Sequence, residues 1–171
     1  KFVIYGVVDS KTSWDLWSVA VDDTSKAAPF LQTDADEQQA KFSPDGNWVT
    51  YVSNESGRNE VYVRPFPFAA GKWQISTEGG IQPRWRADGK ELFYLSSDHK
   101  LMSVEVNTND STFEHRSPNA LFNRRVGGND TPGDYYDVTR DGKRLILNNL
   151  VAEGAYTPIT VMLNWMGEVK R

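Results

Sequence analysis

Residues 41–67 read KFSPDGNWVTYVSNESGRNEVYVRPFP, and this stretch decides the fold class. Near its start, Ser43-Pro44-Asp45-Gly46 has the composition of a tight turn. Proline presets φ at the first corner of a turn, aspartate tolerates the second corner, and glycine adopts a positive φ at little cost. Apolar, aromatic and β-branched residues lie on both sides of these four residues. The stretch therefore predicts a β-hairpin.

The same turn recurs along the chain. Asp45-Gly46 is followed after 43 residues by Asp88-Gly89, and after a further 53 residues by Asp141-Gly142. Each turn leads into a strand-like run: NWVTY, KELFY and KRLIL, respectively. The opening KFVIY fits the same frame without a preceding Asp-Gly. We interpret the following residues as structural turn residues: Ser43, Pro44, Asp45, Gly46, Asp88, Gly89, Asp141 and Gly142.

Further short strands follow each of these runs, so that the repeating unit contains four strands. The third strands are DLWSVAV, EVYVRPF, KLMSVEV and PITVMLNW, and the fourth are APFLQT, KWQIST and NALFN. A period of about 40–50 residues with four strands is typical of a β-propeller blade. We therefore expect an all-β chain of about four blade units, at approximately residues 1–38, 39–80, 81–126 and 134–171. With strands lettered a to d from the centre outward, these units contain strands bcd, abcd, abcd and abc. Only residues 34–41 could form a turn of helix.

The repeat closely resembles a known family. FSPDGNWVTYVSNESGRNEVYVRPFP, followed by WQISTEGGIQPRWRADGKELFYLS, is similar to the TolB-type WD40-like propeller repeat. The resemblance covers essentially all 171 residues and is greatest to the C-terminal propellers of large bacterial proteins, including sensor serine/threonine kinases. It implies a non-catalytic binding or scaffold domain that contacts a protein or a small ligand in the periplasm or elsewhere outside the cytoplasm. The kinase motifs themselves, a glycine-rich loop and a His-Arg-Asp loop, do not occur in this sequence.

The alternative function is an accessory or gating propeller within a larger enzyme. Examples would be the gating propeller of a prolyl-oligopeptidase-like peptidase or a polysaccharide lyase built on a TolB-like ring. The chain itself has no Gly-x-Ser-x-Gly elbow, and its residues suggest no Ser/His/Asp set. We therefore expect that this chain is not an enzyme and that it binds no cofactor.

Composition excludes several other classes of protein. The formal net charge of -4 argues against a nucleic-acid partner, because such a partner requires a basic surface. No apolar run approaches the roughly 20 residues of a membrane-spanning helix. The sequence contains no cysteine, so disulfides, zinc–thiolate sites and thiol catalysis are excluded.

The incomplete outer units raise the question of how the ring closes. Propellers contain about four to eight complete blades, and these four units lack strands at both ends. A first unit that starts with strand b leaves an unpaired edge beside the central channel. Two explanations stay open: the chain belongs to a larger ring, with six blades as the expected number, or two copies complete one another as a homodimer.

Polar residues repeat on the expected innermost strands. Lys41, Arg84 and Asp137 stand at one equivalent position of the repeat, and Gln39, Gln82 and Tyr135 stand two residues earlier. These six residues predict a polar axial channel that binds a ligand. The simpler interpretation is a wet tunnel in which they bind water and neighbouring backbone.

The loops opposite the Asp-Gly turns vary in length and composition among the units, which is typical of a functional rim. The rim candidates are Asn54, Glu55, Arg58, Asn59, Glu78, Asp98, His99, Arg124, Arg125 and Asn129. Arg58 and His99 are our first choices for contact with a protein or glycan. The simpler interpretation is that these are solvated loop residues.

No metal site is expected. Asp34, Asp36 and Glu37 form an acidic run, but they lack the glycine and bidentate glutamate spacing of an EF-hand. The two histidines, His99 and His115, do not form an HExxH motif. A surface acidic cluster is the preferred interpretation of the acidic run.

Overall fold

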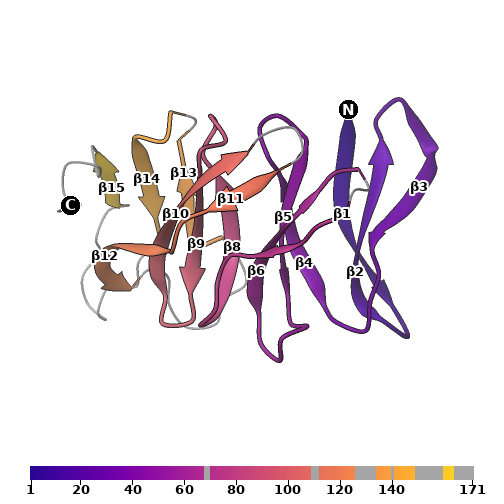
Figure 1. Ribbon diagram of the computed structural model, residues 1–171, viewed down its shortest axis with the longest axis horizontal. Coiled ribbons are helices and arrows are strands. Elements are labelled where there is room, and N and C mark those ends of the chain that lie inside the picture. Colours follow the sequence, from indigo (N-terminus) through magenta and orange to yellow (C-terminus); the bar gives the residue numbers. More distant parts are fainter. Residues whose placement is uncertain (68–69, 109–111, 126–133, 140, 149–159, 164–171) are drawn as a thin grey trace.

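The computed structural model describes residues 1–67, 70–108, 112–125, 134–139, 141–148 and 160–163. The described residues form strands and their connections, with no helix, so none of them belongs to a helix that could cross a membrane. The strands make four antiparallel sheets, which follow one another along the long axis of the molecule from sheet 1 to sheet 4 (Figure 1). The prediction of an all-β chain is confirmed.

Sheets 1 and 2 come from the first part of the chain. Sheet 1 has the order β1 (Phe2–Asp9), β2 (Ser13–Ala20) and β3 (Asp23–Leu31). Sheet 2 has the order β4 (Glu37–Phe42), β5 (Trp48–Ser53), β6 (Glu60–Pro65) and β7 (Trp73–Gln74). The possible turn of helix at residues 34–41 is therefore wrong, because pairing with β5 holds β4 extended.

Sheets 3 and 4 come from the second part of the chain. Sheet 3 has the order β8 (Gly80–Trp85), β9 (Glu91–Ser96), β10 (Lys100–Thr108) and β11 (Phe113–His115), and β12 (Asn119–Arg125) also pairs with β10. Sheet 4 has the order β13 (Tyr136–Val138), β14 (Arg144–Leu147) and β15 (Thr160–Leu163). Short connections join the neighbouring antiparallel strands β8, β9 and β10 of sheet 3, and β13 and β14 of sheet 4.

The Asp-Gly turns join the first two strands of sheets 2, 3 and 4 with one hydrogen-bond pattern. The glycine N–H donates to the carbonyl three residues earlier, at 2.9 Å for Gly46, 2.9 Å for Gly89 and 2.8 Å for Gly142. All three glycines have a positive φ, between 67° and 78°. In each turn the aspartate carboxylate also accepts from the backbone N–H two residues later, at 3.1 Å. These turns thus form scaffold of constant geometry on one side of the sheets.

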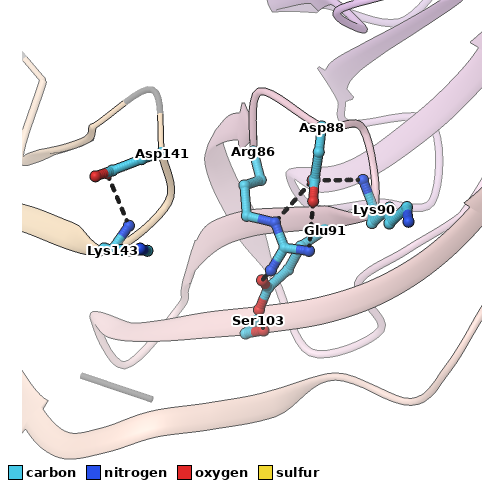
Figure 2. A network of polar contacts seen from close by, with 7 residues as sticks. All are labelled: Arg86, Asp88, Lys90, Glu91, Ser103, Asp141 and Lys143. Carbon is cyan, nitrogen blue, oxygen red and sulfur yellow. Dashed lines mark hydrogen bonds and ion pairs between the residues drawn. The ribbon is translucent and has the colours of Figure 1, made fainter. Parts of the chain in front are cut away.

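One turn residue departs from this pattern and links two sheets. Where sheets 2 and 4 have a hydroxyl residue, sheet 3 has Arg86, whose guanidinium pairs with Asp88 and Glu91 at 2.7 Å and 2.5 Å (Figure 2). The Asp88 carboxylate raises the pKa of Arg86, and the pKa of Asp88 falls in turn, so both groups stay charged. A Cβ on Gly142 would lie 2.4 Å from Cδ of Arg86, which shows that the arginine stem packs against the next turn.

Apolar side chains fill the three junctions between successive sheets. We call the side of a sheet that points toward the sheet 1 end its front face, and the opposite side its back face. The front face of sheet 2 (Val49, Tyr51 and Tyr62) packs on Leu16, Phe30 and Leu31 of sheet 1. The back face of sheet 2 (Trp48, Val52, Val61, Val63 and Ile75) packs on Leu92, Tyr94, Val104, Val106 and Phe113 of sheet 3. The back face of sheet 3 (Phe93, Leu95 and Leu101) packs on Tyr135, Tyr136, Leu145 and Leu147 of sheet 4.

Candidate functional site

Two glutamines connect the innermost strands of neighbouring sheets. Gln39 on β4 and Gln82 on β8 both have φ of 55°, and the ladder that each strand forms with its neighbour is irregular at that point. This bulge aims each side chain along the row of sheets. Oε1 of Gln39 accepts from the N–H of Gln82 at 2.6 Å, and Oε1 of Gln82 accepts from the N–H of Tyr135 at 2.9 Å. We call this chain of bonds the glutamine relay, and it engages the carbonyl end of both amides.

A charged group lies beside the relay, at the boundary of sheets 3 and 4. Nη2 of Arg84 is 2.7 Å from Oδ1 of Asp134, and its Nε is 3.9 Å from Oδ1 of Asp137. The arginine side chain is only 13% exposed, whereas the two aspartates are 68% and 75% exposed. Two exposed carboxylates therefore lie beside a largely covered guanidinium.

Tyr136 contacts both Gln82 and Arg84. Its hydroxyl donates to the carbonyl oxygen of Gln82 at 2.6 Å, and Cζ of Arg84 lies 6.0 Å from the centre of its ring. Burial raises the pKa of Tyr136 well above its ordinary value, and the charge of Arg84 opposes this rise. The phenol consequently stays protonated and keeps its donor at neutral pH.

His99, a rim candidate, also lies near these residues. It occupies the corner of the β9–β10 hairpin with φ of 62°, and its N–H donates to the carbonyl of Ser96 at 2.9 Å. Its ring centre is 6.1 Å from that of Tyr135. A left-handed backbone at a histidine costs energy that glycine would avoid, so the side chain is held at this corner at some conformational expense.

We call the combined set the axial cluster: Arg84, His99, Asp134, Tyr135, Tyr136 and Asp137. Four of these residues were candidates from the sequence, but Asp134 and Tyr136 were not. Asp134 lies three residues before Asp137 and one before Tyr135, so the signal available was its place at the entrance to an innermost strand. Lys41, at the repeat position of Arg84, is exposed on β4, and its carbonyl accepts from the indole N–H of Trp85 at 3.4 Å.

Arg58 lies apart from the axial cluster, on the β5–β6 loop. Its Nε is 3.2 Å from Oε1 of Glu60, whose side chain is 1% exposed. The same glutamate accepts from the N–H of Gly79 at 2.9 Å and from the hydroxyl of Ser76. Arg58 therefore helps to neutralise a buried carboxylate, and the outer part of its side chain reaches solvent.

Most of the other rim candidates bond to residues of neighbouring loops or strands. Asn54 binds the carboxylate of Asp36 at 3.0 Å, Glu55 pairs with Lys72 at 2.6 Å, and the carbonyl of Glu78 accepts from Ser97. Asp98 pairs with Lys100 at 2.8 Å, while the carbonyl of Asn59 accepts from Gly80. The side chains of Arg124 and Arg125, and all of Asn129, lie outside the described residues.

The acidic run before β4 does not converge on one point. Asp36 accepts from the N–H of Trp14 at 3.3 Å and from Asn54, whereas Glu37 is buried and accepts from the hydroxyl of Thr33. Asp34 is exposed. No group of three or more His, Cys, Asp or Glu side chains that could hold a metal ion occurs in the described part of the chain.

Chemically, the axial cluster offers charge and hydrogen bonds on a firm support. Its two exposed carboxylates accept hydrogen bonds and attract cations, and the half-buried ring of His99 lies nearby, whereas the rings of Tyr135 and Tyr136 are buried beneath the group. The glutamine relay fixes the backbone beneath it, because each strand is tied to the next through an amide. This arrangement is suited to recognition of a partner with donor or cationic groups.

Known proteins resemble this chain in fold but not in sequence. No protein-family model matches the chain, and no curated protein matches it in sequence. In structure it is similar to TolB from Acinetobacter baumannii, with a TM-score of 0.54 and 13% identity over 95% of this chain and 50% of that one. The chain thus spans half the length of the TolB structure that it matches.

Two enzymes show a similar likeness. Oligogalacturonate lyase from Vibrio parahaemolyticus matches with a TM-score of 0.52 and 16% identity, over 85% of this chain and 35% of the lyase. A puromycin-hydrolyzing peptidase from Mycobacterium tuberculosis matches with a TM-score of 0.55 and 14% identity, over 85% of this chain and 25% of the peptidase. At these identities the likeness concerns the fold alone. Together with the row of antiparallel sheets, it shows that this chain has a TolB-like β-propeller fold.

Proposed function

We propose that this chain is a non-catalytic binding propeller that contacts a protein or a small extracytoplasmic ligand through the axial cluster and the adjoining rim. The observation that carries the proposal is the pair of exposed carboxylates of Asp134 and Asp137, held beside the covered guanidinium of Arg84. One arginine and two aspartates leave a net negative group. The favoured ligand is therefore a peptide segment or small molecule that carries an ammonium or guanidinium group.

Titration with lysine-containing and arginine-containing peptides tests this proposal. Binding should weaken about tenfold in a variant with both Asp134→Asn and Asp137→Asn, which corresponds to about 1.4 kcal/mol. Glu114→Gln is the matched control, because Glu114 is an exposed carboxylate on the outermost strand β11. Equal weakening in the control, or no binding by any cationic peptide, would contradict the proposal.

The second candidate is an accessory propeller within a larger enzyme. It is favoured by the likeness to the lyase and the peptidase, in which the matching region is 35% and 25% of the whole chain. In that case the chain would position or admit a substrate while a different domain performs the reaction. Turnover by this chain alone that disappears on replacement of Arg84, Asp137 or His99 would point instead to catalysis in the axial cluster.

We further propose that the binding form contains more than one copy of the chain. Among the described residues, no sheet covers the outer face at either end of the row, where Tyr5 is 37% and Ile146 is 45% exposed. A rigid binding ring requires that these faces be covered, because exposed apolar faces promote association.

A further inference from the structure

The first sheet exposes side chains whose equivalents are buried in every other sheet. In the repeat, Val3 corresponds to Val49, Leu92 and Leu145, as KFVIY, NWVTY, KELFY and KRLIL show. Val3 is 48% exposed, whereas the other three are 0%, 1% and 0% exposed. The difference does not come from residue type, because all four are aliphatic.

The neighbouring position behaves in the same way. Tyr5 corresponds to Tyr51, Tyr94 and Leu147, and its exposed fraction is 37% against 1%, 4% and 2%. Val3 and Tyr5 lie two residues apart on β1 and therefore share one side of the sheet, where Tyr5 pairs with Trp17 of β2. The indole nitrogen of Trp17 is buried and has no hydrogen-bond partner among the described residues. This front face of sheet 1 has the composition of a junction but no sheet upon it.

At the opposite end of the row, a residue on the back face of sheet 4 is exposed. Ile146 of β14 corresponds to Ile4, Thr50 and Phe93, which lie on back faces. Thr50 and Phe93 are 0% exposed, and Ile4 packs against the junction of sheets 1 and 2, but Ile146 is 45% exposed. In the part of the chain that the structure describes, the front face of sheet 1 and the back face of sheet 4 thus carry no further sheet.

We propose that the front face of sheet 1 docks on the back face of sheet 4 of a second copy of this chain, and reciprocally. This inference rests on the proposed self-assembly and names its surfaces. All three internal junctions place a front face on a back face, so the contact would continue an interface that the fold already uses three times. Such head-to-tail contacts close into rings when the rotation permits. Two copies with four sheets each give eight, the upper end of the usual propeller range of about four to eight, and three copies would exceed it.

Light scattering on the 171-residue chain is the first test. The expected mass is twice 19.3 kDa. Tyr5→Glu on the front face and Ile146→Glu on the back face should each yield monomers. Val8→Glu is the matched control, because Val8 lies on the same strand, is 63% exposed and alternates away from Val3 and Tyr5, so this variant should remain a dimer.

Mixing the two face variants tests the head-to-tail arrangement itself. Each variant retains the face that the other lacks, so an equimolar mixture of Tyr5→Glu and Ile146→Glu should recover dimers through one intact junction. A face-to-like-face dimer predicts otherwise, because Ile146→Glu alone would then stay dimeric. If Tyr5→Glu fails to fold by circular dichroism, Val3→Lys replaces it, since Val3 is 48% exposed.

Three results would overturn the inference: a monomeric wild-type chain at all concentrations, a dimeric Ile146→Glu variant, or a mixture that stays monomeric. A monomeric wild type would mean that a partner other than a second copy covers the front face. The peptide titration at the axial cluster is read separately through Asp134→Asn alone, because Asp134 precedes β13, whereas Asp137 pairs with Ile146 and therefore shares the back face of sheet 4.

Discussion

Two junctions bury a carboxylate at the same repeat position: the junction between sheets 2 and 3, and the junction between sheets 1 and 2. They differ in how many hydrogen bonds the carboxylate accepts. In the former, Glu60 begins β6 and is 1% exposed. One of its oxygens accepts from the N–H of Gly79 at 2.9 Å and lies 3.2 Å from Arg58, and the other accepts from the Ser76 hydroxyl. Both oxygens are therefore satisfied.

The junction between sheets 1 and 2 is less complete. Asp15, at the repeat position of Glu60, is 0% exposed, and both of its side-chain donors, Thr12 and Gln32, bind the same oxygen. The other oxygen, Oδ1, has no hydrogen-bond partner in the part of the chain that the structure describes. A second acid, Glu37, begins β4 and likewise has an unpartnered Oε2 among the described residues.

The contrast shows how a repeat accommodates a buried acid. Glu37 and Gly80 occupy the same position, the first residue of β4 and of β8. Glycine at position 80 leaves room for the Ser76–Glu60 bond, whereas glutamate at position 37 places a second acid in the junction. Burial raises the pKa of Glu37, and the charge of Asp15 raises it further. A buried carboxylate without enough donors favours its protonated form, because the charged form loses its hydration.

The largest effect is expected from Gly80→Val, which would break the complete junction. A Cβ at this position would lie 2.5 Å from Oγ of Ser76 and 3.0 Å from Cγ2 of Val61. The Ser76–Glu60 bond would be displaced inside a packed core, at a cost of about 3 kcal/mol in the free energy of unfolding. Urea denaturation monitored by tryptophan fluorescence measures this change.

Gly46→Val is the matched control for that experiment. A Cβ on Gly46 would meet no atom within 4 Å, but its φ of 78° is unfavourable for valine. The expected cost is about 1–3 kcal/mol from backbone strain. A larger loss at position 46 than at position 80 would contradict the steric explanation of the complete junction.

A smaller effect is expected from Gln82→Ala, which extends the comparison to the junction of sheets 3 and 4. Gln82 is 5% exposed, and its removal would leave the buried N–H of Tyr135 without this acceptor, at a cost of about 2 kcal/mol. Gln39→Ala, at the exposed equivalent position, should cost about 1 kcal/mol or less, because water can replace the lost acceptor. Hydrogen exchange at the Tyr135 amide should accelerate only in the Gln82 variant. Equal losses of stability in both variants would show that burial does not decide the strength of the relay.

The smallest effect, and the only stabilising one, is expected from Glu37→Gln. A raised pKa in the folded state means that protonation stabilises the fold: this contribution is complete below about pH 4.5, the ordinary value, and disappears as pH rises through the higher folded pKa. At pH 7 the variant should therefore be more stable than wild type by about 1 kcal/mol, the low end of the cost of a buried acceptor without a partner. The advantage should vanish in acid, which thermal unfolding between pH 4 and pH 7 would reveal. A variant that is less stable at pH 7 would mean that the charged form is satisfied by groups such as ordered water.

Much of the fold could be predicted from the sequence, because its determinants are local. Pro44 and Gly46 specify a turn within four residues, and the recurrence of Asp-Gly fixes the repeat frame along the chain. The all-β class followed from these signals and the TolB-like fold from the resemblance of the repeat to a known family, and both are confirmed. The blade boundaries and the number of blades in the complete ring stay predictions.

Less of the candidate site than of the fold could be predicted from the sequence. Repeat positions identified Gln39 and Gln82, but their direction depends on a left-handed φ at a residue other than glycine, which has no sequence signal. The bond between Arg84 and Asp134 joins residues 50 positions apart, so only the packing of β8 against β13 reveals it. The roles of these residues in binding stay predictions, since geometry alone does not identify a ligand.

The glutamine relay also bears on how such a chain can lengthen or shorten in evolution. Each glutamine carbonyl binds a backbone N–H of the next unit, a group that any residue except proline provides. A duplicated unit inserted between two existing ones would donate its backbone N–H to the glutamine of the preceding unit. Its own glutamine would accept from the backbone N–H of the following unit, so no compensating substitution would be needed. Gene duplication can therefore change the number of units while the glutamine-to-backbone bonds between innermost strands are preserved.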